Sequence, residues 1–280
     1  MKQKAIFQSL ADENLITKEK PFRSFIYNDY SIELHNHDFY EMNIILSGHG
    51  IHQIENACYE IEKGDVFVIP PFTVHSYHHT QNLNVQHIII HKDFIISNMA
   101  ESVKVQGYLQ LMEIEPFLRQ NSSSAMFLHL SKNKLTELQN ELKFFEEDSI
   151  FYNDEYLPLK NHIMWKIIYW LSHLLFKQIS SVETTPLNKH ETAIFSSLEY
   201  IHQNFGEKLT VNILAQKAFL SRSTYLRSFF EICNCTPTKY ILDYRLKKAC
   251  EMMENSKFSK TEIAHLCGFY DLSHMERSMK

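Results

Sequence analysis

The sequence predicts an α+β protein in which a small β-barrel precedes a helical region. Residues 22–90 contain short β-branched and aromatic runs separated by turn signals such as Ser47–Gly50 and Lys63–Asp65, a pattern typical of a sandwich or barrel. After Asp93 the apolar residues recur at helical spacing instead. The last third contains two short pairs of predicted helices, and each pair is joined by a tight turn. Because the chain has 280 residues, it is long enough for about two domains with separate cores.

The composition is that of a soluble protein without a membrane partner. Apolar residues make up 44% of the chain and charged residues 22%, as in ordinary globular domains. No apolar run reaches the ~20 residues of a transmembrane helix, and the N-terminus lacks the apolar core of a secretory signal. We therefore expect a cytoplasmic protein whose five cysteines are reduced thiols.

The net charge of −5 is unevenly distributed. Residues 190–280 hold 12 Lys and Arg against 10 Asp and Glu, a formal charge of +2, and the remainder holds 16 against 23, a charge of −7. A mildly positive C-terminal region is compatible with DNA contact through a local patch.

Candidate binding residues lie in the predicted barrel. His35 and His37 are two positions apart, so on one strand they face the same side. Glu41 shares that side if the strand stays regular, and His75 follows on a later strand. Imidazoles and a carboxylate that converge in this way suit a divalent transition metal.

The spacing of these residues resembles the two sequence motifs of the cupin fold. The first motif is matched over residues 35–48 and the second over residues 64–75. Each match has departures, because the leading glycine is missing, Phe72 replaces a glycine and His79 replaces an asparagine. The spacing nevertheless favours a cupin-like barrel.

Three interpretations of the motif residues stay open. The first is an effector pocket, because cupin sensor domains often keep parts of the motifs while binding a small organic ligand. Its predicted lining residues are His35, His37, Glu41, His75, Phe39 and Tyr77. The second is a structural role in the barrel. The third is a metal site formed by the three histidines and the glutamate. We adopt the first and expect no cofactor.

The middle of the chain contains two predicted amphipathic helices, over residues 132–148 and 155–179. Apolar stripes at helical spacing most often pack inside a domain, but they also dock against a second copy in a two-fold dimer. We expect a homodimer. The predicted organisation is a sensing domain (1–130), a helical dimerisation segment (131–181), a linker (182–190) and a helix-turn-helix domain (191–280).

Helix signals are clearest from residue 209 onward. Thr210 and Ser221 are suited to cap two short helices that are separated by a tight turn. The second helix buries Tyr225 and Phe229 and leaves polar side chains exposed. This is helix-turn-helix geometry, in which the second helix enters a DNA major groove.

A longer helix begins at Thr236–Pro237 and leads to a second pair of helices. Ser259–Glu262 forms a capping box, Cys267–Phe269 makes the turn, and Asp271 or Ser273 caps the last helix. The second pair is a weak repeat of the first.

This arrangement resembles the DNA-binding region of AraC/XylS family transcription regulators, in which a rigid helix joins two helix-turn-helix units. The match runs from about residue 188 to the end, and an N-terminal cupin sensor is a common partner for it. The matching residues are Tyr200-Ile201, Leu209-Thr210, Leu214-Ala215, Leu220-Ser221, Phe229, Thr236-Pro237, Tyr240, Arg245-Leu246, Ala249, Ile263-Ala264, Gly268-Phe269, Asp271, Ser273 and Arg277.

The resemblance implies a DNA-binding transcription regulator, not an enzyme, whose DNA binding is modulated by an effector in the cupin-like domain. Its implied partners are double-stranded promoter DNA, a small-molecule effector such as a sugar, a second copy of the chain and RNA polymerase. Two alternatives remain open. One is a metal-dependent cupin enzyme of dioxygenase or isomerase type, and the other is a truncated regulator that dimerises but binds DNA poorly.

Positions carried over from the family predict the DNA contacts. The base-edge contacts are Ser223, Leu226 and Arg227 in the first unit and Leu272, Ser273 and Arg277 in the second. An arginine pairs with O6 and N7 of guanine together. The phosphate contacts are Arg222, Thr224 and Lys239.

The DNA-binding region departs from the family pattern at Asn234, at Met275 and at its end. Met275 replaces the usual aromatic residue of the second recognition helix. Asn234 stands where a glycine usually follows the first recognition helix, and asparagine tolerates positive φ better than other non-glycine residues. The family pattern continues beyond Lys280, so we expect an incomplete second unit and assign most base reading to the first.

Overall fold

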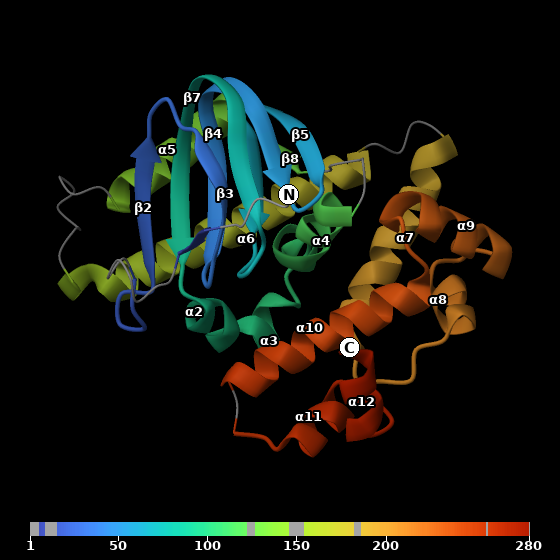
Figure 1. Ribbon diagram of the computed structural model, residues 1–280. Helices are drawn as coiled ribbons and strands as arrows, with labels where there is room; N and C mark the ends of the chain where they lie inside the picture. Colours follow the sequence, from blue (N-terminus) through green and yellow to red (C-terminus); the bar gives the residue numbers. More distant parts are fainter. Residues whose placement is uncertain are drawn as a thin grey trace. The chain divides into compact units, whose positions relative to one another are not determined.

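The computed structural model describes residues 6–8, 16–121, 127–145, 154–181, 186–255 and 257–279 (Figure 1). The chain divides into two compact units, residues 1–181 and residues 182–280, called unit 1 and unit 2 below. Unit 1 contains a β-sheet with helices, and the described part of unit 2 is helical. The predicted α+β class, with a sheet domain followed by a helical region, is confirmed.

Unit 1 is built on one eight-stranded sheet with the order β1-β3-β7-β4-β6-β8, in which β2 also pairs with β7 and β5 with β4. The β1–β3 pair is parallel and the other pairs are antiparallel. The strands are β1 (Ile6–Gln8), β2 (Phe22–Tyr27), β3 (Ile32–His37), β4 (Tyr40–Ile54), β5 (Ala57–Glu62), β6 (Asp65–Ile69), β7 (His75–Ile90) and β8 (Leu128–His129).

Strands β4 and β7 form the longest pair of the sheet, from Tyr40 opposite Ile90 to Ile54 opposite His75. The register shifts three times between residues 45 and 51, so both strands bend there. Gly48 lies at this bend with a φ of +76°, and a Cβ on it would come 2.2 Å from the carbonyl oxygen of Asn82. Glycine is therefore required where the two strands cross closely.

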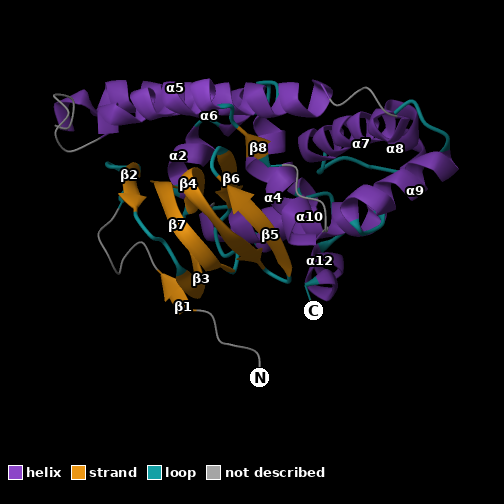
Figure 2. Cartoon of the chain, turned by 90° about the horizontal axis from the view of Figure 1, so that it is seen from above, coloured by secondary structure: helices purple, strands orange, loops and turns teal. Residues whose placement is uncertain are grey.

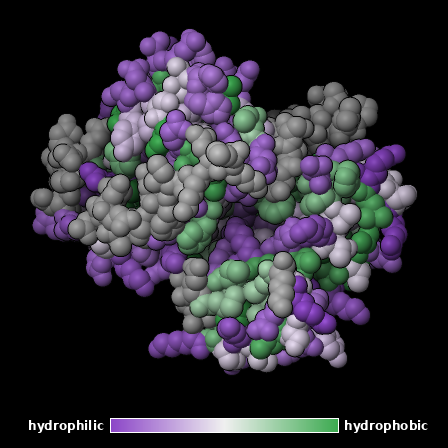
Figure 3. Space-filling view, viewed as in Figure 1, coloured by the Kyte–Doolittle hydropathy of each residue, from purple (hydrophilic) through white to green (hydrophobic). Residues whose placement is uncertain are grey.

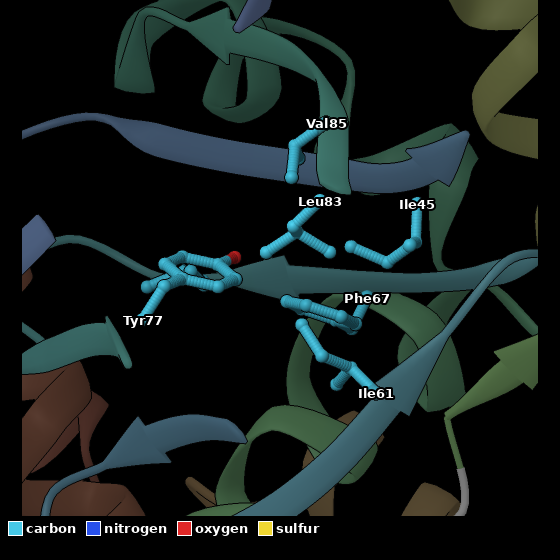
Figure 4. Packing of buried hydrophobic residues seen from close by; sticks show 7 residues of the cluster. Ile45, Ile61, Phe67, Tyr77, Leu83 and Val85 are labelled. Carbon is cyan, nitrogen blue, oxygen red and sulfur yellow. The ribbon is translucent and has the colours of Figure 1, made fainter. Parts of the chain in front are cut away.

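The inner face of the sheet holds the apolar core of unit 1. Figure 4 shows Tyr77, Leu83 and Val85 of β7 near Ile45 of β4 and Phe67 of β6. These side chains are all buried, and each contributes about 1.5–3 kcal/mol by burial. Because alternate residues of a strand share a face, the same alternation carries polar residues of β3, β4 and β7 into this interior.

Helices cover one side of the sheet in unit 1, and α5 and α6 lie along it (Figure 2). The predicted stripe of the second helix includes Ile163, Ile167 and Leu171, which are all buried within unit 1. The helical segments are α2 (Lys92–Ser97), α3 (Met99–Ser102), η1 (Gln110–Ile114), α4 (Glu115–Asn121), α5 (Lys132–Leu142), η2 (Lys143–Phe145), η3 (Asp154–Tyr156) and α6 (Leu157–Ser181). Most of this stripe is therefore core, while Trp170 and Leu174 remain half-buried.

Unit 2 consists of α7 (Pro186–Gln203), α8 (Val211–Lys217), α9 (Arg222–Cys233), α10 (Pro237–Asn255), α11 (Lys260–Leu266) and α12 (Leu272–Ser278). Helix α7 begins within the range predicted as a linker, since proline is favoured at the first helical position. Residues 182–185 of that range lie outside the described residues. Figure 3 shows apolar side chains at the surface around α10–α12. Among the described residues, no helix has the length and apolarity needed to cross a membrane.

The predicted caps of unit 2 are confirmed. The Thr210 and Ser221 side chains accept hydrogen bonds from the backbone of α8 and α9, and the Ser259–Glu262 capping box opens α11. Asp271, rather than Ser273, caps α12. Each such cap stabilises its helix by about 1 kcal/mol.

The two helix-turn-helix turns share one backbone conformation. The amide of Leu220 donates to Ala215 O, and that of Phe269 donates to Ala264 O. The preceding residues, Phe219 and Gly268, have φ values of +54° and +75°. This left-handed conformation costs a non-glycine residue about 1–2 kcal/mol.

Arg245 of α10 joins the two helix-turn-helix units to each other. Its guanidinium donates to the carbonyl oxygens of Phe205 (2.8 Å) and Glu207 (2.6 Å), which precede α8, and of Gly268 (2.8 Å), in the second turn. One side chain thereby fixes both units on the connecting helix.

We predict opposite effects for substitutions at the two turns. Phe219→Gly should stabilise unit 2 by up to about 1 kcal/mol, because it relieves the left-handed strain and the Phe219 ring is 96% exposed. Gly268→Ala should destabilise it by more than about 1 kcal/mol, since its Cβ would lie 2.7 Å from the Arg245 guanidinium. Urea unfolding of the full chain measures both, and a stability loss in Phe219→Gly would contradict the strain argument.

Candidate functional site

Four polar residues converge in the interior of unit 1 and form the first candidate site. His35 and His37 lie on β3, Glu41 on β4 and His75 on β7. All four are buried, with exposures of 5% or less. We call His35, His37, Glu41 and His75 the histidine–glutamate cluster.

The pairing of β3 with β7 brings the two motifs together. His35 lies directly opposite His75, and their ring centroids are 4.1 Å apart. Nε2 of His37 lies 3.2 Å from Oε2 of Glu41. The chain turns between residues 37 and 40, so Glu41 lies on the next strand rather than continuing β3. The residues predicted from the sequence therefore do meet, but Glu41 reaches the histidines from a second strand and not as a continuation of β3.

The imidazole rings of the cluster are held by the backbone. Nδ1 of His35, His37 and His75 lies 3.0, 2.8 and 3.1 Å from a carbonyl oxygen two residues away in the chain. Burial lowers the pKa of His35, and it lowers the pKa of His75 further. Both rings are therefore neutral at pH 7, with the proton on Nδ1.

Glu41 is oriented by two further side chains. Its Oε1 accepts hydrogen bonds from Asn43 Nδ2 (2.7 Å) and His87 Nδ1 (3.0 Å). Burial alone would raise the pKa of Glu41, but the attraction of His87 and its hydrogen bond to the carboxylate hold the pKa well below its usual value. The cluster thus contains one ionised carboxylate.

Aromatic rings surround the cluster. Phe39 stacks on His37 at 4.2 Å, and the Tyr77 hydroxyl accepts a hydrogen bond from Asn43 at 2.6 Å. Tyr77 also stacks on His52, at 4.7 Å. All the residues predicted to line an effector pocket therefore lie in or beside the cluster.

Sequence reasoning missed Asn43, His52 and His87 as members of this environment. Strand alternation would have found the first, which is two positions after Glu41 and shares its face. His52 and His87 lie far along the two long strands, and they enter the site because β4 pairs with β7, which places His87 opposite Asn43 and His52 opposite Tyr77.

A buried ion pair supports the site from α4. Arg119 is fully buried; its Nε donates to Glu115 at 2.8 Å, and a second nitrogen donates to the carbonyl oxygen of Val68. Its Nη1 lies 3.5 Å from Nδ1 of His52. Burial, reinforced by this positive charge, keeps the pKa of His52 well below its usual value. Burial also raises the pKa of Glu115, against the opposing effect of Arg119.

The second candidate site is the exposed face of α9. Arg222, Ser223 and Arg227 are exposed, while Tyr225 and Phe229 on the opposite face are buried. Thr224 and Leu226 are half-buried. Helix α9 ends at Cys233, and the next residue, Asn234, has a φ of +51°, which agrees with the expectation that asparagine replaces glycine here.

The predicted basic residues near α9 have intramolecular contacts. Arg222 donates to Asn212 Oδ1 at 2.7 Å and so links α9 to α8. Arg227 Nε lies 4.0 Å from Glu231, with 68% of its side chain exposed. Lys239 on α10 forms an ion pair with Asp243. Arg227 is thus the least constrained of the three.

Helix α12 presents fewer of the predicted DNA-contact residues than α9. Met275 of α12 is buried in the core formed with α10 and α11. Ser273 and Arg277 are exposed and Leu272 is half-buried. The Arg277 guanidinium donates to Ser273 O of its own helix, at 3.2 Å.

Comparison with known proteins matches both units. The model of the AraC-like ligand binding domain matches residues 23–149, and that of a helix-turn-helix domain matches residues 214–280. A regulator described as the uncharacterized HTH-type transcriptional regulator YdeC of Bacillus subtilis is 25% identical over 248 residues, covering 87% of this chain and 80% of the relative. The HTH-type transcriptional activator RhaS of Escherichia coli is 27% identical over 240 residues, covering 86% and 80%.

A crystal structure of ToxT from Vibrio cholerae is similar over 93% of this chain and 94% of its own, at 16% sequence identity and a TM-score of 0.36. Both of these relatives are described as transcription regulators. The prediction that this chain is not an enzyme is thereby confirmed.

We predict that Arg119 is essential to the stability of unit 1. Arg119→Met should cost about 3–5 kcal/mol, because it leaves Glu115 as a buried carboxylate without its counter-charge. The double variant Arg119→Met/Glu115→Met should recover most of that loss. Urea unfolding of the three proteins tests this, and additive losses in the double variant would contradict it.

Proposed function

The chain belongs to the AraC/XylS family of transcription regulators, and we propose that α9 reads its promoter DNA while a ligand in unit 1 controls that reading. The family provides DNA binding and regulation as the general activity. The contact residues, the ligand and the coupling are the specific parts of the proposal.

The proposed DNA contact rests on the residues that α9 exposes. The N-terminal half of a recognition helix contacts base edges in the major groove, and this half of α9 presents Arg222, Ser223 and Arg227. The caps at Thr210 and Ser221 fix α8 and α9 before DNA arrives. Binding therefore orders little of the backbone.

The three basic side chains have different proposed roles. Arg227 reads a guanine, because its guanidinium is exposed and its contact with Glu231 is long. Arg222 first positions α9 on α8 through Asn212 and also lies beside the phosphates. Lys239 contacts phosphate after releasing Asp243. Ser223, Thr224 and Leu226 complete the first contact set.

The second helix-turn-helix contributes Leu272, Ser273 and Arg277 in this proposal. Arg245 fixes the two helix-turn-helix pairs of unit 2 on α10, so both recognition helices meet DNA with one fixed spacing. Half-site spacing then follows from the protein geometry.

The proposed regulatory ligand binds at the histidine–glutamate cluster, beside Phe39 and Tyr77. Such a ligand acts only through a difference in affinity between two states of the protein. We further propose that the regulator works in the cytoplasm, where it meets RNA polymerase at the promoter.

Dimerisation is a further part of the proposal. Trp170 and Leu174 of α6 stay half-buried after the rest of its stripe is packed in unit 1, and they offer an apolar surface to a second copy. Two copies would then present paired recognition helices to a two-part operator. Light scattering of the full chain measures this state, and a monomer at micromolar concentration would exclude it.

We predict that Arg227→Ala weakens binding to the specific site by about 1–3 kcal/mol and relaxes discrimination at one base pair. Lys239→Ala is the comparison, because loss of a phosphate contact should weaken all sequences similarly and lower the salt slope by about 1. Fluorescence anisotropy with the chain's own upstream region and a scrambled duplex separates these effects.

One result of this experiment would contradict the base-reading role of Arg227. If Arg227→Ala loses the same affinity for the specific and scrambled duplexes, Arg227 contacts only phosphate. If the unsubstituted chain does not distinguish the two duplexes at any salt concentration, that upstream region is not its operator.

A further inference from the structure

The three histidines of the cluster present lone pairs rather than donors to its centre. Nδ1 of His35, His37 and His75 faces a backbone carbonyl oxygen in each case. A carbonyl oxygen only accepts hydrogen bonds, so Nδ1 carries the hydrogen. In the neutral ring, Nε2 is then an unprotonated nitrogen of the kind that binds metal ions.

These lone pairs meet a carboxylate instead of a hydrogen-bond donor. Nε2 of His37 faces Oε2 of Glu41 at 3.2 Å, and two such acceptors repel unless a cation lies at or beside them. Nε2 of His75 is buried and has no hydrogen-bond partner among the residues that the structure describes. A buried acceptor without a partner costs about 1–3 kcal/mol. The arrangement is therefore incomplete without a positive group.

We propose that unit 1 binds one first-row divalent transition metal ion through His35, Glu41 and His75, and that this ion is the effector of the regulator. This inference rests on the proposed function, because it names the class of ligand that controls DNA binding. His37 supplies a further nitrogen beside the site.

The ligand geometry fits such an ion. The ligand atoms of His35, Glu41 and His75 lie within 4.8 Å of one another. Metal bonds of about 2.0–2.2 Å place the ligand atoms of a tetrahedral ion about 3.3–3.6 Å apart, so the ligand atoms that lie farthest apart move closer by about 1 Å when the ion binds.

The surrounding residues complete the site as an outer shell. Asn43 and His87 both hold Oε1 of Glu41, which leaves Oε2 directed at the histidines. The backbone carbonyl oxygens that accept a hydrogen bond from each Nδ1 hold the imidazole rings in their orientation. Such partners are typical of metal-binding histidines. Two imidazoles and a carboxylate without thiolate favour Zn²⁺, Fe²⁺, Co²⁺ or Ni²⁺ over Ca²⁺ or Mg²⁺.

A proton on His37 is the rival cation. It would complete the contact between His37 and Glu41, but it would leave Nε2 of His75 without a donor. A metal ion serves both nitrogens at once. The two alternatives differ in whether the protein binds metal stoichiometrically, so binding measurements separate them.

The test uses the full chain, purified without an affinity tag and freed of metal with a chelator. Titration with Co²⁺ should produce a visible ligand-field band that saturates at one ion per chain, and Zn²⁺ should displace it. Glu41→Gln and His75→Gln should lose this binding. His49→Gln removes an exposed histidine of β4 and should keep it.

A second measurement needs no variant. Zn²⁺ at 100 times its Kd should raise the unfolding midpoint of the unsubstituted chain, because it binds only the folded state. DNA affinity for the specific duplex should differ at least about 5-fold between Zn²⁺ and chelator, the lower end of ordinary allosteric coupling.

The outcomes separate the inference from the proposed function. Selective DNA binding without stoichiometric metal binding would overturn the metal inference alone. Metal binding with unchanged DNA affinity would overturn the ion's role as effector. Loss of selective DNA binding under both conditions, with metal still bound, would overturn the proposed function.

Discussion

The pairing of β4 with β7 is the constraint on which unit 1 depends. These two strands run past each other from Tyr40 and Ile90 to Ile54 and His75, and they bend at Gly48 because only glycine fits there. The bend lets β7 pair with β2 near one end and with β3 near the other. As a result, residues from two distant sequence motifs face one interior. The polar cluster is a consequence of this pairing. Burial keeps His35 and His75 neutral, and His87 keeps Glu41 ionised.

Unit 2 depends on local interactions of a different kind. Short helices such as α8, α11 and α12 have little stability alone, so side-chain caps and the Arg245 hydrogen bonds determine whether they stay in place. Buried hydroxyl pairs, such as Ser197 with Tyr225 at 2.7 Å, align α7 with α9. The exposed arginines of α9 are therefore presented by a preformed scaffold. This arrangement lets the surface residues of α9 vary in sequence without loss of the fold.

Local signals in the sequence predicted the helical unit more fully than the sheet. Caps at Thr210, Ser221 and Ser259 and the left-handed Asn234 depend on a few neighbouring residues, and these were predicted correctly. The roles of Arg119, His52 and His87 depend on contacts between residues more than 40 positions apart. Periodicity predicts which face a residue occupies but not which distant residue it meets. The same limit explains why the cluster residues were identified while their outer shell was missed.

We propose that one chain combines selective DNA reading with control by an ion in the histidine–glutamate cluster. Selection of bound fragments from the genomic DNA of the source organism, with the full chain in Zn²⁺ and in chelator, tests both parts together. We expect the recovered fragments to share a two-part sequence and their enrichment to change between the two conditions. Fragments without a common sequence, or equal enrichment of the same fragments in both conditions, would contradict it.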